Sequence, residues 1–186
     1  MNVDDLRYPI GKFEFRPRTS LRERQGLAEE YELAPDWLED AASGLTDAQL
    51  DTAYRPNGWT VRQVIHHLPE SQMNAYVRLK LALTEDLHRS VVADEDAWAS
   101  LPDSRNGPIV IALSLFRALQ LRWAMAIRSM SDADFARLVW HPEWGKVRLE
   151  YLVQVYAWHP RHHIAQITTL RDRMGWDRVG DAEAGR

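Results

Sequence analysis

The chain has 186 residues, of which 45% are hydrophobic and 27% are charged, and its formal net charge is −4. This length suits one domain with a sizeable core, so we expect residues 1–186 to form a single domain. A net negative charge without a clustered basic face argues against nucleic acid as a partner. The absence of cysteine excludes disulfides, cysteine-ligated zinc and a cysteine nucleophile, and it fits a reducing cytoplasm.

The N-terminal segment, residues 1–19, is dotted with proline and arginine and is expected to form an extended arm. Its two early aspartates and its lack of an apolar h-region argue against a signal peptide. The longest apolar run, near 109–116, is far shorter than the roughly 20 residues that cross a bilayer. We therefore expect a soluble, cytoplasmic protein without a membrane partner.

The first long helix is predicted to begin after Ser20. Ser20 and Glu23 match a capping box, in which each side chain accepts a hydrogen bond from the other residue's free backbone N–H. Apolar residues then recur at helical spacing as far as Gly44, a typical C-terminal residue. Pro35 is expected to bend or interrupt this helix.

A second long helix is predicted from Thr60 to about Thr84. It follows a turn at 54–59, and Gln63 stands three residues after the capping threonine. About two dozen helical residues span ~35–40 Å. Further elements are expected in this order: a connection at 85–107 with a short helix near 94–99, a helix at about 108–130, a short helix from Ser131, a loop or small hairpin at 139–147, a helix at about 148–174, and a disordered tail at 176–186.

Four long helices without a convincing set of strands predict an all-α fold, a four-helix bundle. The connection at 85–107 holds over 20 residues, and extended chain of that length covers ~65 Å or more. It can therefore cross the whole bundle. The second and third helices can then run parallel, which a short loop would forbid.

Three histidines predict a metal site inside this bundle. His159 and His163 are four residues apart, so both imidazoles lie on one helix face and can reach one ion, as in helical zinc motifs. On the second helix, His67 shares a partly polar face with Ser71 and Asn74, and a polar strip inside a bundle needs partners or a metal. Three nitrogen ligands with an open fourth position are typical of a catalytic metal site. The alternative is that these are hydrogen-bonded core histidines.

The neighbouring polar residues have weaker claims. Glu70, three residues after His67, is the candidate general base or partner of an imidazole, although a solvent-facing glutamate fits the pattern equally. The side chain of His66 points away from the helix face that carries His67, and that of His162 points away from the face that carries His159 and His163. Arg161 could hold an anionic group of a substrate, or it could simply be solvated.

Several motifs, in the same order along the chain, resemble those of the DinB/YfiT-like superfamily. The main ones read AYRPNGWTVRQVIHHLPESQMNAYVRLKLALTED at 53–86 and YAWHPRHH at 156–163. The segments RYPIGKFE at 7–14 and SLPDS at 100–104 are also similar. The resemblance therefore extends over nearly the whole chain.

This resemblance implies an up-down-down-up four-helix bundle with one divalent metal ion per subunit, zinc or nickel. The ligands that it implies here are His67, His159 and His163. Proteins of this family are described as metal-dependent hydrolases, and a subset as bacillithiol S-transferases; they are often homodimers. The implied partners are a small thiol and an electrophile, or a small hydrolysable substrate.

Two prolines depart from the family pattern. Pro69 follows His67 by two residues, and Pro160 directly follows His159. Each proline removes one helical hydrogen bond and clashes with the carbonyl four residues earlier, so we expect kinks beside the ligands.

Three functions remain open from the sequence. Three neutral imidazoles leave a divalent ion its full charge, which favours ionisation of a water or a thiol. S-transfer of the bacillithiol type is the first expectation, and hydrolysis of a small substrate is the second. The third is a non-catalytic, stress-linked metal-binding or ligand-binding module.

Overall fold

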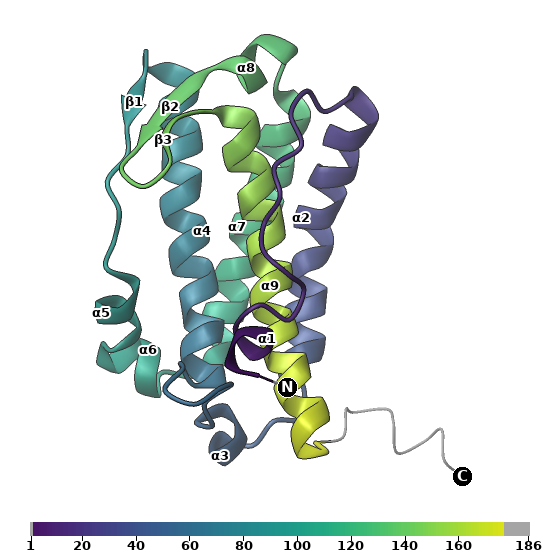
Figure 1. The fold of residues 1–186 in the computed structure, drawn as a ribbon, viewed down its shortest axis with the longest axis vertical. Coiled ribbons are helices and arrows are strands. Elements are labelled where there is room, and N and C mark those ends of the chain that lie inside the picture. The colour runs from purple at the N-terminus through teal and green to yellow at the C-terminus, as the bar shows by residue number, and fades with distance from the viewer. Residues whose placement is uncertain (1, 177–186) are drawn as a thin grey trace.

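The structure is a computed structural model that describes residues 2–176. Four long helices form a bundle (Figure 1): α2 (Leu21–Ala42), α4 (Val61–Thr84), α7 (Ile109–Ser129) and α9 (Leu149–Met174). Short helices lie between or before them: α1 (Val3–Arg7), α3 (Asp47–Leu50), α5 (Glu95–Ala99), α6 (Pro102–Asn106) and α8 (Asp132–Ala136). The strands are β1 (His88–Arg89), β2 (Leu138–His141) and β3 (Gly145–Arg148).

The bundle has the predicted up-down-down-up order. In Figure 1, α2 and α9 run downward whereas α4 and α7 run upward. The segment between α4 and α7 returns along the outside of α4, through α5 and α6, to the lower end of the bundle. This long crossover makes α4 and α7 parallel neighbours, and it leaves α4 and α9 antiparallel.

The predicted helix ends are confirmed where local chemistry determines them. Ser20 with Glu23 and Thr60 with Gln63 form complete capping boxes. Gly175 ends α9 in the left-handed conformation, with φ of 64°, which glycine adopts without a Cβ clash.

Some local expectations were wrong. α2 continues through Pro35 without interruption, because packing of its inward face outweighs one lost hydrogen bond. The predicted hairpin joins a third strand, since β1 pairs in parallel with β2, which pairs antiparallel with β3. The N-terminal arm contains α1, capped by Asn2. The disordered tail predicted at 176–186 lies outside the described residues except for position 176.

The apolar core is divided into two clusters. The upper cluster includes Trp123 and Leu152, and the lower cluster includes Leu38 and Phe116. Buried glutamines and histidines also lie on α4, α7 and α9: His67, Gln72, Gln120, His163 and Gln166. Buried polar groups are costly unless they find partners, so their contacts indicate where function resides.

One helix in the described part of the chain is long and apolar enough to cross a membrane. α7 has a mean hydropathy of 1.4 over its most apolar window, which exceeds what the short run near 109–116 led us to expect. Its inward face packs on α2 and α4, with Phe116 and Trp123 fully buried. Core helices of globular proteins meet the same criterion, so the feature alone does not assign a membrane span.

Candidate metal centre

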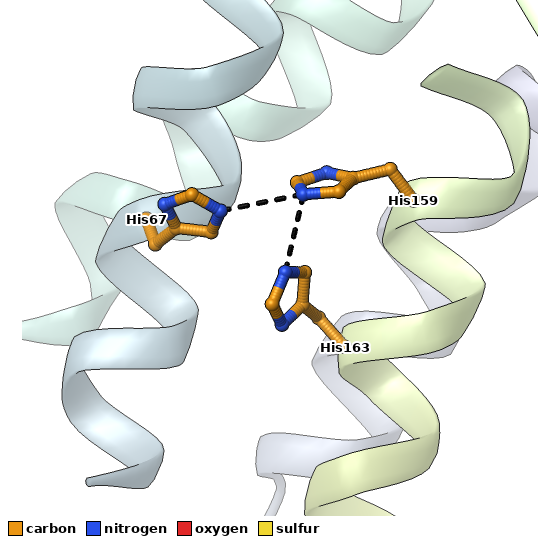
Figure 2. A group of neighbouring side chains, drawn as sticks. All are labelled: His67, His159 and His163. Carbon is orange, nitrogen blue, oxygen red and sulfur yellow. Dashed lines mark hydrogen bonds between the residues drawn. The ribbon is translucent and has the colours of Figure 1, made fainter. Parts of the chain in front are cut away.

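The three predicted histidines converge between α4 and α9 (Figure 2). The Nε2 atom of His159 lies 3.3 Å from Nε2 of His67 and 3.1 Å from Nε2 of His163. One ring nitrogen from each residue lies within 4.8 Å of the other two, and among the described residues this group contains imidazoles only. The helical spacing of His159 and His163 and the antiparallel approach of α4 bring these atoms together.

Hydrogen bonds determine which nitrogen of His163 is free. The amide Nε2 of Gln166 donates to the backbone carbonyl of Arg7 at 2.9 Å, so its Oε1 must be the atom that faces His163 Nδ1, also at 2.9 Å. An amide oxygen only accepts. Nδ1 of His163 therefore carries the proton, and Nε2 presents a lone pair to the other two histidines.

His162 and His66 are occupied elsewhere. Nε2 of His162 accepts from the amide of Gln166 at 3.0 Å, and its ring stacks on Trp158. Burial, followed by the charge of Arg7, lowers the pKa of His162 to about 4. Nε2 of His66 lies 3.2 Å from the carbonyl of Gly107, at the N-terminal side of α7. Neither ring joins the three-histidine group.

The electrostatics of the group suit a cation. Burial is the largest cause that lowers the pKa values of His67, His159 and His163 well below the ordinary range, and their proximity to other histidines adds to it. All three are therefore neutral bases. Donors around a tetrahedral ion with metal–nitrogen distances of ~2.0–2.1 Å lie roughly 3.3–3.4 Å apart, close to the 3.3 Å and 3.1 Å by which His159 Nε2 is separated from its two neighbours. A proton on one of these rings can bridge only two of the three facing nitrogens. A divalent ion would instead bind the lone pairs of all three.

Pro160 does not break α9, and its missing hydrogen bond is replaced. The helix continues through Pro160, as α4 does through Pro69. Without an N–H at position 160, the carbonyl of Tyr156 has no donor four residues on. The buried amide of Gln72 on α4 donates to this carbonyl at 2.9 Å. The hydrogen bond that replaces the one lost at Pro160 therefore joins α9 to α4, about one turn from His159.

A cavity of about 810 Å³ opens beside the three histidines, within the size range of small-molecule sites. Ser71, Asn74 and Glu70 line it, but Arg161 does not; the Arg161 guanidinium lies 3.5 Å from the carboxylate of Glu30. Oε1 of Glu70 accepts from Ser104 at 2.9 Å, and the pKa of Glu70 is raised, mainly by burial.

Two further residues support the histidines, and the sequence predicts neither role, since it assigns Trp59 most simply to the core. Gln166 was not singled out, although it stands three residues after His163, the spacing of helical neighbours. Trp59, just before α4, places its ring 4.7 Å from that of His67 and donates from Nε1 to Asp96 at 2.9 Å. It joins the crossover to the wall of the site.

Comparisons with known proteins agree with this architecture. The DinB superfamily model matches residues 30–167. YfiT of Bacillus subtilis, provisionally named a metal-dependent hydrolase, is 42% identical over 95% of this chain and 99% of its own. A relative from Oceanobacillus iheyensis with the same provisional description is 45% identical over 91% of this chain and 98% of its own. The solved structure of Bacillus subtilis YfiT, described as having an unusual four-helix bundle topology, superposes with a TM-score of 0.90, covering 93% of this chain and 99% of its own.

Proposed function

The chain belongs to the DinB superfamily, and from this premise we propose that it is a metal-dependent enzyme that acts on small molecules. His67, His159 and His163 would hold one divalent ion. The observation that carries the proposal is the convergence of their three Nε2 atoms, each on a neutral ring, beside a cavity large enough for a small substrate.

When bound, a divalent ion lowers the pKa of a coordinated water or thiol. The chain supplies the rest. Gln166 orients His163, Trp59 packs against His67, and the cavity beside them has room for a small substrate. Imidazole donors suit zinc and nickel, and we propose one of these two as the resident metal.

We propose transfer of a bacillithiol-type thiol to a small electrophile as the reaction. A thiol bound to the ion is ionised by the ion's charge, so no neighbouring carboxylate is needed as a base. The described residues within reach of the ion position are imidazoles, and Glu70 is engaged with Ser104. Three imidazoles would ionise a water as well as a thiol, so it is the engagement of Glu70 with Ser104 that leads us to place thiol transfer before hydrolysis.

Hydrolysis of a small substrate is the second candidate, and the names of the relatives favour it. Glu70 would then be the general base. Its pKa is raised by burial, which brings a carboxylate closer to the neutral range in which a base works best. Its hydrogen bond with Ser104 would have to open during turnover.

The test compares metal-loaded with metal-free protein. Incubation with bacillithiol and monochlorobimane is expected to give a conjugation rate above the metal-free control, and no such rate would overturn S-transfer. A panel of small esters and amides tests hydrolysis, with Glu70→Gln as the diagnostic variant. Stoichiometric metal without turnover in either assay would instead support the non-catalytic, stress-linked binding module.

Elemental analysis of protein purified without a histidine tag tests the metal itself. We expect about one zinc or nickel per chain. Protein that takes up neither ion after incubation with a slight excess would overturn the metal-dependent proposal, whatever the substrate.

We also propose a cytoplasmic homodimer, as the family resemblance implies. The outward face of α7 exposes an apolar stripe at helical spacing, with Ile111, Leu115 and Met125 64%, 42% and 64% exposed. Exposed apolar side chains gathered on one helix face are typical of an interface, although the exposed Arg122 lies on the same face. Light scattering of the wild type and of Leu115→Glu tests the proposal: a wild-type monomer would contradict it.

A further inference from the structure

The end of the cavity away from the three histidines contains a buried arginine without an ion pair. Arg78 on α4 is only 7% exposed and lines the cavity. Its Nη1 donates to the hydroxyl of Tyr156 at 2.6 Å, and its Nη2 donates to the carbonyl of Val91 at 2.8 Å. In the described part of the chain, no carboxylate lies within ion-pair distance of it. A buried charge of this kind requires a compensating group.

Two further hydrogen-bond donors accompany Arg78. The hydroxyl of Tyr156 already accepts from Arg78, so its own proton is free to donate. The backbone N–H of Glu143 donates to Nδ1 of His141 at 3.3 Å, which places the proton of the neutral ring on Nε2. Burial lowers the pKa of His141, and the charge of Arg78 lowers it further, so the ring is a neutral donor. Arg78, His141 and Tyr156 all line the cavity.

Two carboxylates also line this end, and they set a competing expectation. Glu95 and Glu143 both line the cavity. Burial, followed by repulsion from Glu143, raises the pKa of Glu95. Neither carboxylate lies within ion-pair distance of Arg78, although the charge of Arg78 acts on Glu95 and opposes the rise of its pKa. They could instead attract an ammonium group, and the experiment must distinguish the two outcomes.

The distance between Arg78 and the three histidines sets the length of a substrate that could reach both. Eleven positions separate His67 from Arg78 on α4, a rise of roughly 16 Å, and the arginine side chain leans back toward the helix N-terminus. The ring of Tyr156 lies 5.9 Å, centroid to centroid, from that of His159. The gap between the guanidinium and the three Nε2 atoms is therefore on the order of 10 Å.

We propose that Arg78, His141 and Tyr156 form a subsite for a carboxylate of the substrate, on the order of 10 Å from its reacting atom. The inference rests on the proposed function, in that the reacting atom sits at the three histidines. It names the substrate class: a small molecule with an anionic group at one end and the reactive thiol or bond at the other.

Calorimetry with matched probes tests the subsite without any variant. The probes are 8-mercaptooctanoate, its neutral amide and the corresponding amine, each titrated into zinc-loaded protein. We expect the carboxylate to bind about 10-fold or more tightly than the amide, because its hydrogen bonds are charge-assisted. Equal affinities would overturn the proposal, and preference for the amine would assign this end to Glu95 and Glu143 instead.

Variants locate the preference. Arg78→Met is expected to abolish the discrimination between carboxylate and amide, whereas Arg161→Met, an exposed arginine outside the cavity, is expected to keep it. Arg78→Lys retains the charge and should retain part of the preference if Arg78→Met fails to fold. Full discrimination in folded Arg78→Met would overturn the assignment.

A second readout separates this inference from the proposed function. In cobalt-substituted protein, a thiolate-to-metal absorption band reports whether the sulfur of the probe reaches the ion. Octanoate against octanamide, which lack sulfur, reports the subsite alone when titrated into metal-free protein, because no ion is then present to bind the carboxylate. A preference for the carboxylate without the absorption band would support the subsite and overturn thiol activation at the ion. The absorption band without a preference for the carboxylate would support thiol activation and overturn the subsite.

Discussion

The α2–α7 and α4–α9 interfaces of this bundle differ in the polarity of their buried side chains. Between α2 and α7 the buried side chains are apolar, as at Leu38 and Phe116, and ion pairs such as Arg117 with Asp36 lie outside. Between α4 and α9 the buried side chains include histidines and glutamines. The first interface is an ordinary helix contact, and the second replaces apolar burial with the histidines that we propose bind the metal ion.

This difference separates stability from function along the same bundle. Apolar packing stabilises the fold in proportion to the buried area and does not require particular atom-to-atom directions. The contacts between α4 and α9 instead require a hydrogen-bond donor to face an acceptor. Changes at the first interface should therefore lower the free energy of unfolding and leave metal binding intact. Changes to the three histidines or to Gln166 at the second interface should lower metal affinity and leave the helices folded, and the following predictions test this division.

Phe116→Ala is expected to have the largest effect. Its ring is fully buried in the lower apolar cluster, and truncation should lower the free energy of unfolding by about 3–5 kcal/mol. Chemical denaturation measures this loss, while metal content of the folded variant should equal that of the wild type. The control Leu121→Ala, on the same helix but 46% exposed, should change stability by about 0.5 kcal/mol or less. Loss of metal in folded Phe116→Ala would contradict the division.

His163→Ala is expected to lower metal affinity by more than about 100-fold, the upper range for residues that act only behind a ligand. Competition with a chromophoric chelator measures the affinity, and circular dichroism should show that the helices persist. His66→Ala is the matched control, since its ring contacts Gly107 outside the group. Equal metal binding by His163→Ala and wild type would identify the cluster as core histidines.

The sequence predicted the parts of the fold that local chemistry determines. Capping boxes located α2 and α4, and the four-residue spacing placed His159 and His163 on one face. The pairing of His67 with them depended on the partly polar face of its helix and on the family resemblance. Gln166 and Arg78 were not predictable, because their roles arise from partners far along the chain: the carbonyl of Arg7, the hydroxyl of Tyr156 and the carbonyl of Val91.

Gln166→Leu sharpens the comparison within α9. Removal of the acceptor for Nδ1 of His163 frees the ring to adopt the other tautomer, and metal affinity should fall about 10–100-fold. Gln154→Leu is the matched control, because Gln154 also lies on α9 and also bonds the N-terminal arm, at Arg16, but it does not contact the three histidines. Equal losses in both variants would mean that the arm, and not the tautomer, determines affinity.

Gln72→Leu should have the smallest effect of the four. The variant leaves the carbonyl of Tyr156 without a donor, and a buried unsatisfied acceptor should lower the free energy of unfolding by about 1–2 kcal/mol. Pro160→Ala restores the backbone N–H that can bond this carbonyl within α9. The double variant should therefore be more stable than Gln72→Leu alone, and denaturation of the full double-mutant cycle measures the coupling. Strictly additive effects would show that Gln72 does not compensate for the proline, and the contact between α4 and α9 beside His159 would then need another explanation.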